Sequence, residues 1–191
     1  MSLDAEIIVV SGLPRSGTSL MMQMLDRGGI PALTDEIRTA DVDNPRGYFE
    51  FERVKKTKHD PSWLPEARGK AVKMVSALLY DLPASETYRV IFMRRDLDEI
   101  LESQEKMLAR LARPAAPREQ MSSSFAVHLE RLFQWLPQQG HLRALEVSYN
   151  DLLGDPDREA AKITDFLDGA PAVSRMLEAI DPALYRNRNA V

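Results

Sequence analysis

Short apolar runs alternate with longer segments of helical periodicity along the chain. The runs fall at residues 7–10, 71–75, 88–93 and 141–147. The first is a continuous β-branched run, IIVV, which is typical of a strand that is buried on both faces of a sheet. Strands that alternate with helices predict a parallel sheet with helices on both of its faces. The pattern therefore predicts an α/β fold with three layers, α/β/α, around a central parallel sheet.

The segments between the apolar runs carry helix signals. Asp96 can cap a helix, and Glu99 three residues later completes a capping-box pattern. Gly28 and Gly29 end the first helix, and the proline-rich stretch at 114–117 separates two later ones. The predicted helices cover residues 18–27, 61–68, 97–111, 118–136, 157–167 and 173–179. Ligands of such sheets bind at the carboxyl ends of the strands, so we expect the functional residues there.

Residues 30–60 are mostly polar or charged and have weak periodicity. In a compact domain such a stretch is often an active-site loop. Its first residues, 30–33, are apolar enough to form a further strand of the sheet. We therefore expect the rest of this segment to border the ligand site.

Composition narrows the classes of protein. The 191 residues suit one domain, residues 1–191, with 44% hydrophobic and 28% charged residues. The net charge of -4 argues against a general nucleic-acid binder. The absence of cysteine excludes disulfides and thiolate metal sites. The first apolar run is too short to span a membrane, and acidic residues precede it where a signal peptide has basic ones, so we expect a soluble cytoplasmic protein.

The segment between the first strand and the first helix, residues 12–19, reads GLPRSGTS. Its glycines have the spacing of the P-loop pattern G-x-x-x-x-G-K-S/T, but Thr18 stands where that pattern has lysine. Backbone N–H groups of residues 16–18 can still bind a phosphate, and Arg15 supplies a cation. The loop suits a phosphate and a neighbouring oxyanion better than ATP with magnesium. A turn that uses glycine only for shape would not explain the arginine and hydroxyls.

Within this loop, Pro14–Ser19 (PRSGTS) resembles the 5′-phosphosulfate loop of PAPS-dependent sulfotransferases, P-K/R-S-G-T-T/S. The arginine form is similar to the loops of tyrosylprotein and carbohydrate sulfotransferases. The resemblance implies a P-loop NTPase-like fold and an enzyme that transfers a sulfuryl group from PAPS (3′-phosphoadenosine-5′-phosphosulfate) to an unidentified hydroxyl or amine acceptor, leaving PAP (adenosine 3′,5′-bisphosphate). The donor-binding residues that it implies here are Arg15, Ser16, Gly17, Thr18 and Ser19.

A second match follows the strand at 88–93, which runs into Arg94 and Arg95. Sulfotransferases bind the 3′-phosphate of PAPS with an arginine just after a strand and a serine eight residues later. Ser103 lies eight residues after Arg95, so the resemblance implies that Arg95 and Ser103 bind the 3′-phosphate. Arg94 would take the place of Arg95 if the alignment with the family motif is shifted by one residue. Taken singly, the two would be a solvated arginine paired with Asp96 or Glu99 and an ordinary helix-surface serine. A metal-binding strand of this type would end in aspartate, so we expect no metal.

The general base of the implied reaction has three candidates. Residues 34–38 (TDEIR) resemble an E-E-T-R-like motif of tyrosylprotein sulfotransferases, which assigns the role to Glu36. Glu50, in the aromatic-flanked GYFE, is the main rival, because heparan-type enzymes use a glutamate in such a motif. His59 is the third candidate. The alternative for both glutamates is an ordinary surface carboxylate in a charged loop.

Two further basic features bear on the site. Lys73 interrupts an apolar strand, AVKMV, where cytosolic sulfotransferases carry K-x-H, and Val75 replaces the histidine. Lys73 is either catalytic, together with Arg15, or a strand-end lysine that snorkels to solvent. Arg186 and Arg188 lie where many of these enzymes fold an Arg-Lys-Gly segment over the 3′-phosphate, and a solvated tail is the plainer interpretation.

Two other classes of function remain open at this level. A P-loop kinase of small metabolites shares the predicted fold but would need the P-loop lysine and a magnesium-binding aspartate. A non-catalytic PAP-binding protein would keep the nucleotide pocket without turnover. Binding of PAP without magnesium would favour the sulfotransferase or the binding protein, and turnover would separate those two.

Overall fold

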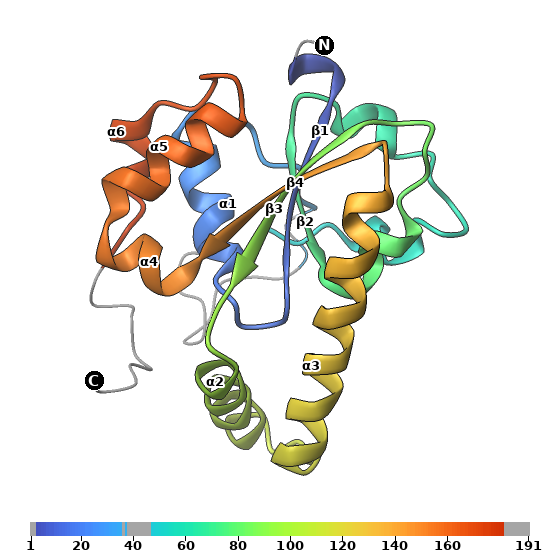
Figure 1. Ribbon diagram of the computed structural model, residues 1–191, viewed down its shortest axis with the longest axis vertical. Helices are drawn as coiled ribbons and strands as arrows, with labels where there is room; N and C mark the ends of the chain where they lie inside the picture. Colours follow the sequence, from blue (N-terminus) through green and yellow to red (C-terminus); the bar gives the residue numbers. More distant parts are fainter. Residues whose placement is uncertain (1–2, 36, 38–46, 182–191) are drawn as a thin grey trace.

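The computed structural model describes residues 3–35, 37 and 47–181. Its sheet has the order β2-β1-β3-β4, and all neighbouring strands are parallel (Figure 1). The strands are β1 (Ile7–Gly12), β2 (Ala71–Val75), β3 (Tyr88–Arg94) and β4 (Leu142–Ser148). The four predicted strands are confirmed, and their ends differ by at most two residues from the prediction.

Helices cover both faces of this sheet. The α-helices are α1 (Thr18–Arg27), α2 (Leu97–Arg110), α3 (Arg118–Trp135), α4 (Tyr149–Gly154), α5 (Pro156–Phe166) and α6 (Val173–Leu177). The 3-10 helices are η1 (Leu3–Ala5), η2 (Glu52–Lys56), η3 (Leu64–Ala67), η4 (Ser76–Asp81) and η5 (Leu136–Gln138). α1, α4, α5 and α6 share a core with one face, and α3 with η2 to η5 shares a core with the other, which confirms the three-layer fold (Figure 1). No helix in the described ranges is long and apolar enough to span a membrane.

The two cores follow from the alternation of side chains along β1. Ile7 and Val9 belong to the core that contains α3, while Ile8 and Val10 belong to the core that contains α1. Successive strand residues point to opposite faces of a sheet, and β1 lies between β2 and β3. All four side chains are fully buried, as the IIVV run predicted.

Some predicted elements differ in the structure. Residues 30–33, predicted as a strand, form one isolated bridge, between Ala32 and Ala71. Pro31 has no N–H group to donate, which limits a longer ladder here. Residues 61–68, predicted as a short helix, contain only η3, and α4 was not predicted because its six residues are too few for a periodic signal.

Arg89 is a charged residue in β3 whose side chain is only 2% exposed. Its Nε donates to the buried carboxylate of Glu6 at 2.6 Å, and its terminal nitrogens donate to the Phe166 carbonyl and the Asp168 carboxylate. The hydrogen bond from Arg89 holds the pKa of Asp168 below its usual value. The cluster thus joins the start of β1 to the end of α5 through β3.

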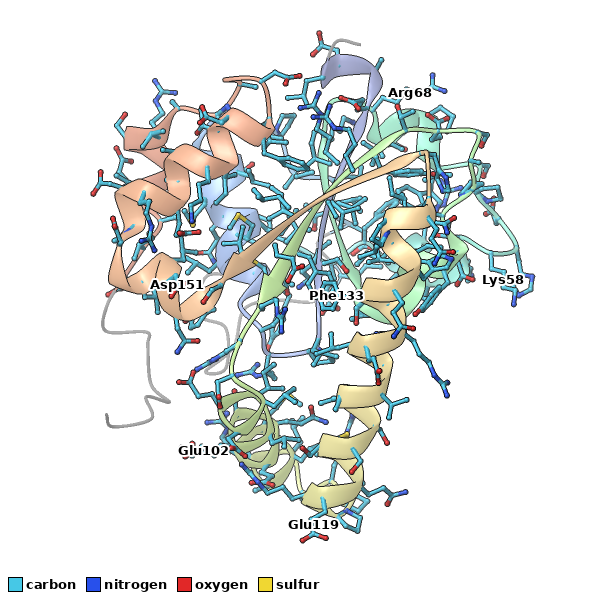
Figure 2. The ribbon with its side chains drawn as sticks, viewed as in Figure 1. Lys58, Arg68, Glu102, Glu119, Phe133 and Asp151 are labelled. Atoms are coloured by element: carbon cyan, nitrogen blue, oxygen red, sulfur yellow. The ribbon has the colours of Figure 1, made fainter. Side chains whose placement is uncertain are left out.

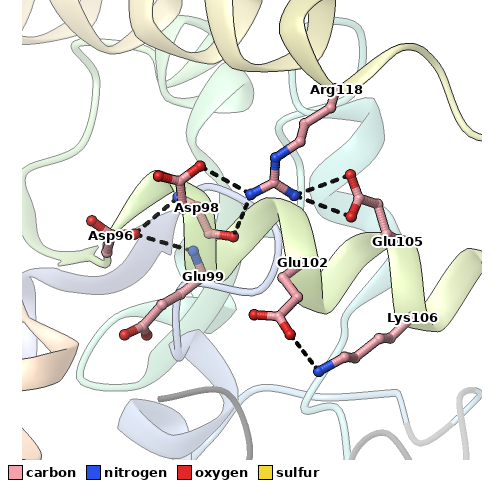
Figure 3. Close-up of polar contacts among 7 residues, drawn as sticks. All are labelled: Asp96, Asp98, Glu99, Glu102, Glu105, Lys106 and Arg118. Atoms are coloured by element: carbon pink, nitrogen blue, oxygen red, sulfur yellow. Dashed lines mark hydrogen bonds and ion pairs between the residues drawn. The ribbon is translucent and has the colours of Figure 1, made fainter. Parts of the chain in front are cut away.

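α2 and the first half of α3 lie beyond the carboxyl ends of the strands (Figure 1). Arg118, at the start of α3, donates to Asp98 and Glu105 of α2 (Figure 3). Toward the other end of α3, Phe133 (Figure 2) packs against Phe92 of β3 with ring centroids 5.0 Å apart. α3 therefore ties α2 to the sheet and holds it over the strand ends.

Candidate functional site

A cavity of about 900 Å³ lies at the carboxyl ends of the strands. Its walls come from the loop after β1, the end of β2, α2 and α4, together with residues of the segment 48–55. The predicted site residues and candidate base that line it are Arg15, Gly17, Thr18, Ser19, Glu50, Lys73, Arg95 and Ser103. Parallel strands end at one edge of a sheet, and this brings together residues that are far apart in the sequence.

The loop between β1 and α1 depends on its glycines. Gly17 has a φ of 98°, in the left-handed region, and a Cβ there would lie 2.3 Å from the ring of Tyr149. A Cβ on Gly12 would lie 2.6 Å from the carbonyl oxygen of Met93. Neither position can take a side chain unless the loop moves. The start of α1 borders the cavity, and the first N–H groups of a helix form a site for oxyanions.

Two residues of this loop have features that are typical of a ligand site, one in its side chain and one in its backbone. The Ser16 hydroxyl is buried and has no hydrogen-bond partner among the described residues. Buried hydroxyls are normally hydrogen-bonded, so this one calls for an acceptor. Arg15 has a φ of 71°, a strained conformation for a residue other than glycine, and such strain is common at binding sites.

Arg95 and Ser103 meet Arg15 in one corner of the cavity. Arg15 Nε donates to the buried Ser103 hydroxyl at 2.9 Å, and Arg95 donates to the Arg15 carbonyl at 3.2 Å. The Arg95 guanidinium also donates to Glu99 at 2.8 Å and lies 4.6 Å from the ring centroid of Tyr149. Neither Arg95 nor Ser103 is therefore the surface residue of the alternative interpretation.

Glu99 and Tyr149 hold Arg95 in place. The sequence offered Glu99 as a partner of Arg95 only in the alternative interpretation of a solvated arginine, and it did not identify Tyr149 as a site residue. The Asp96 carboxylate caps α2 as predicted, by accepting from the N–H groups of Asp98 and Glu99. The buried Glu99 carboxylate accepts from Arg95, which lies four residues earlier, and this spacing was the available signal. Tyr149 belongs to a segment that had no functional signal in the sequence beyond its position after a strand.

Arg94, the substitute for Arg95, lies elsewhere. Its side chain is half-exposed and pairs with Glu146 of β4 at 2.8 Å. Its guanidinium lies 5.0 Å from the ring centroid of Phe133. Of the two arginines, only Arg95 lines the cavity.

Lys73 and Glu50 face each other beside the glycine loop. Lys73 Nζ donates to the Tyr48 carbonyl and, at 3.3 Å, to the Ser19 hydroxyl. It lies 3.8 Å from Glu50 Oε1, and the two side chains are 12% and 26% exposed. The Lys73 amine therefore points into the cavity instead of snorkelling to bulk solvent.

Glu36 lies outside the described residues, so its assignment as the base stays a prediction. Its neighbour Asp35 donates its N–H to the Glu50 carbonyl at 3.1 Å and accepts from the Glu52 N–H at 2.6 Å. His59 is exposed and is not among the described residues that line the cavity. Two further predicted site residues outside the described ranges are Arg186 and Arg188.

Comparison with known proteins gives one family. A family model described as the sulfotransferase family matches residues 49–171. No curated protein sequence matches the chain significantly. The matched segment contains Lys73, Arg95 and Ser103 but not the glycine loop after β1.

Solved structures of sulfotransferases share the fold. The sulfotransferase domain from the curacin biosynthetic pathway has a TM-score of 0.56 and 16% identity, over 92% of this chain and 78% of that chain. Sulfotransferase STF1 from Mycobacterium tuberculosis H37Rv has a TM-score of 0.55 and 14% identity, over 91% and 70%. A sulfotransferase from Alicyclobacillus acidocaldarius has a TM-score of 0.50 and 15% identity, over 94% and 87%. These similarities confirm the predicted P-loop NTPase-like α/β fold.

Proposed function

Because the chain belongs to the sulfotransferase family, we propose that it transfers a sulfuryl group from PAPS to a hydroxyl or amine acceptor. The observation that carries this proposal is the meeting of the two predicted phosphate motifs in one cavity. Arg15 of the glycine loop hydrogen-bonds Ser103, and Arg95 hydrogen-bonds the Arg15 backbone. The glycine loop lies outside the matched residues 49–171, so it supports the proposal independently of the family match.

The donor would bind across this corner of the cavity. Its 5′-phosphosulfate would lie at residues 16–19, and its 3′-phosphate at Arg95 and Ser103. Arg15 lies between the two and can contact either group. The glycines leave room for the phosphosulfate, and the buried Ser16 hydroxyl offers a hydrogen-bond donor, so the residues present fit PAPS.

The transfer would proceed by in-line displacement without a metal. The acceptor oxygen or nitrogen attacks sulfur, the bond from sulfur to the 5′-phosphate oxygen breaks, and PAP leaves with the electron pair. A carboxylate takes the acceptor's proton, and the described geometry favours Glu50 for this role, with Glu36 as the base that the TDEIR motif predicts. Lys73 and Arg15 would supply positive charge to the sulfuryl oxygens and the leaving phosphate.

Arg95→Ala is expected to weaken PAP binding by about 1.5–3 kcal/mol and to weaken adenosine 5′-phosphosulfate binding much less. Only PAP carries the 3′-phosphate that Arg95 would bind. Isothermal titration calorimetry gives both affinities. Arg94→Ala is the matched control, since the neighbouring arginine is outside the cavity, and it should leave both affinities unchanged. Equal losses for the two nucleotides in Arg95→Ala would remove Arg95 from the 3′-phosphate role.

PAP binding is expected not to require magnesium. β3 ends in an arginine and Arg95 follows it, where a magnesium-dependent nucleotide site has an aspartate, and Thr18 replaces the P-loop lysine. PAP affinities with and without magnesium should differ by less than tenfold, or about 1.4 kcal/mol. In a thermal-shift assay, greater stabilisation by ATP with magnesium than by PAP would favour the kinase instead.

Turnover separates the enzyme from a non-catalytic PAP-binding protein. The direct measurement is the formation of PAP from PAPS in the presence of a panel of hydroxyl and amine acceptors. Acceptor-dependent PAP formation supports the transferase. Tight PAP binding without acceptor-dependent turnover would support the binding protein.

A further inference from the structure

Gln23 of α1 is a buried polar residue that lines the cavity and that the proposed function does not use. The residue is only 8% exposed. Its side-chain amide forms no hydrogen bond with any residue that the structure describes. Buried amides are normally hydrogen-bonded, because an amide that has lost its water without gaining a partner destabilises the protein. A buried amide beside a cavity and without a protein partner therefore indicates contact with a ligand.

Helical geometry turns Gln23 away from the sheet. The side chains of α1 that belong to the core are those of Met21, Met22, Met24 and Leu25. At 3.6 residues per turn, Gln23 lies on the opposite side of the helix from the centre of this group. Packing against the sheet therefore does not explain a glutamine at this position.

The two helical neighbours of Gln23 show what its side of α1 faces. Residues four apart are neighbours on a helix surface, so Gln23 lies between Ser19 and Arg27. Ser19 accepts from Lys73 at 3.3 Å, at the end of the cavity where the sulfuryl group would be transferred. Arg27 donates to the Glu178 carbonyl at 3.1 Å, and the residue after Glu178 lines the cavity. Gln23 is therefore about 6 Å along the helix from Ser19, on the side of α1 that faces the end of α6.

The proposed phosphate positions leave this part of the cavity for the base of the donor. The 5′-phosphosulfate would lie at residues 16–19 and the 3′-phosphate at Arg95, while Glu50 would face the acceptor. Tyr149 lies next to both phosphate positions, because its ring is 4.6 Å from the Arg95 guanidinium and 2.3 Å from where a Cβ on Gly17 would be. The base, which projects from the ribose between the two phosphates, would then lie between Tyr149 and the outer face of α1.

We propose that Gln23 recognises the adenine base of the donor. Its amide oxygen would accept a hydrogen bond from the N6 amino group, and its amide nitrogen would donate to the neighbouring ring nitrogen. A glutamine amide carries an acceptor and a donor side by side, and it can form this pair of bonds with adenine. Gln23 would thus determine specificity for the donor without taking part in the transfer. The inference rests on the proposed function, because it assumes that PAPS is the donor.

The test compares PAP with the same bisphosphate carrying purine, which lacks the N6 amino group, by isothermal titration calorimetry. The unaltered protein is expected to bind PAP at least about tenfold more tightly, because purine leaves the amide oxygen without a donor. Gln23→Met keeps the length of the side chain and removes the amide, so it should bind the two compounds about equally. Gln134→Met is the matched control, because Gln134 is an exposed glutamine of α3 that does not line the cavity, and it should keep the preference.

Thermal unfolding without nucleotide separates recognition of a ligand from a structural role. Since the amide has no described protein partner, Gln23→Met should unfold at the same temperature as the unaltered protein or at a higher one. A clear fall in that temperature would overturn the inference, because the amide would then stabilise the fold itself.

Two binding results would also overturn it: equal affinity of the unaltered protein for PAP and the purine compound, or a preference that survives in Gln23→Met. Binding of neither compound by the unaltered protein would instead contradict the proposed function, and this inference with it. Binding of PAP without the preference would contradict the inference alone.

Discussion

Glu50→Gln is expected to lower turnover by about 10²–10⁴-fold and to leave PAP affinity nearly unchanged. The substitution keeps the shape of the side chain and removes the carboxylate that would accept the proton of the acceptor. Glu50 lines the cavity, and the amine of Lys73 lies 3.8 Å from its carboxylate and 3.3 Å from Ser19 of the glycine loop. The carboxylate is therefore close to the proposed position of the transferred group. The rate of PAP formation at saturating PAPS and the calorimetric affinity for PAP are the two measurements.

Two further variants test whether Glu50 is the general base. Glu52→Gln is the matched control, because Glu52 lines the same cavity but pairs with Lys55 at 2.5 Å, and it should keep near-normal turnover. Glu36→Gln tests the base that the TDEIR motif predicts. If it abolishes turnover while Glu50→Gln does not, the base is Glu36. If neither variant loses activity, a carboxylate base is wrong, and His59 or the acceptor itself must take the proton.

Arg89→Met is expected to lower the free energy of unfolding by about 3–5 kcal/mol. Methionine fills much of the same space but leaves the buried Glu6 carboxylate without its partner. The substitution also removes the hydrogen bond to the Phe166 carbonyl. Denaturant unfolding measures the loss. Arg27→Met is the matched control, because Arg27 pairs with Glu178 at 3.9 Å on the surface, and it should cost less than about 1 kcal/mol. Similar losses in both variants would contradict a special role for the buried cluster.

The same variant has an expected pH dependence. Asp168 has a lowered pKa in the folded protein, chiefly because it accepts a hydrogen bond from Arg89. A carboxyl group of this kind stabilises the fold above the pKa that it has in the unfolded chain, about 3.9. That contribution is lost as the pH falls through the lower folded value. The difference in stability between the unaltered protein and Arg89→Met should therefore narrow below about pH 4.

The local sequence was enough to predict the main strands and helices. It was also enough to predict that the site lies at the edge of the sheet where the strands end. The IIVV run, the glycines after it and the cap at Asp96 each act over a few residues, so they specify a strand, a tight turn and a helix start without distant contacts. Once the strands are parallel, their carboxyl ends must lie at one edge. This is why Arg15 and Arg95 could be expected near each other although 80 residues separate them.

Other contacts depended on how distant segments pack. The sequence could not show that Glu50 lies beside Lys73, because residues 48–55 follow an irregular path with no periodic signal. The sequence favoured Glu36, from the TDEIR motif and from a predicted strand at 30–33. That strand forms only one bridge, and Glu36 itself lies outside the described residues, so its role stays a prediction. The support of Arg95 by Tyr149 also depends on helix placement.

The sequence by itself determined the four strands, most of the helices, the glycine loop and the types of residue at the strand ends, because short-range geometry decides these. Only the tertiary structure decided which charges are partnered. Arg89 looks like any polar residue in a strand, yet it is buried against Glu6, 83 residues away. Whether a charge is exposed, paired or turned into a cavity depends on desolvation by segments that meet only in the folded chain.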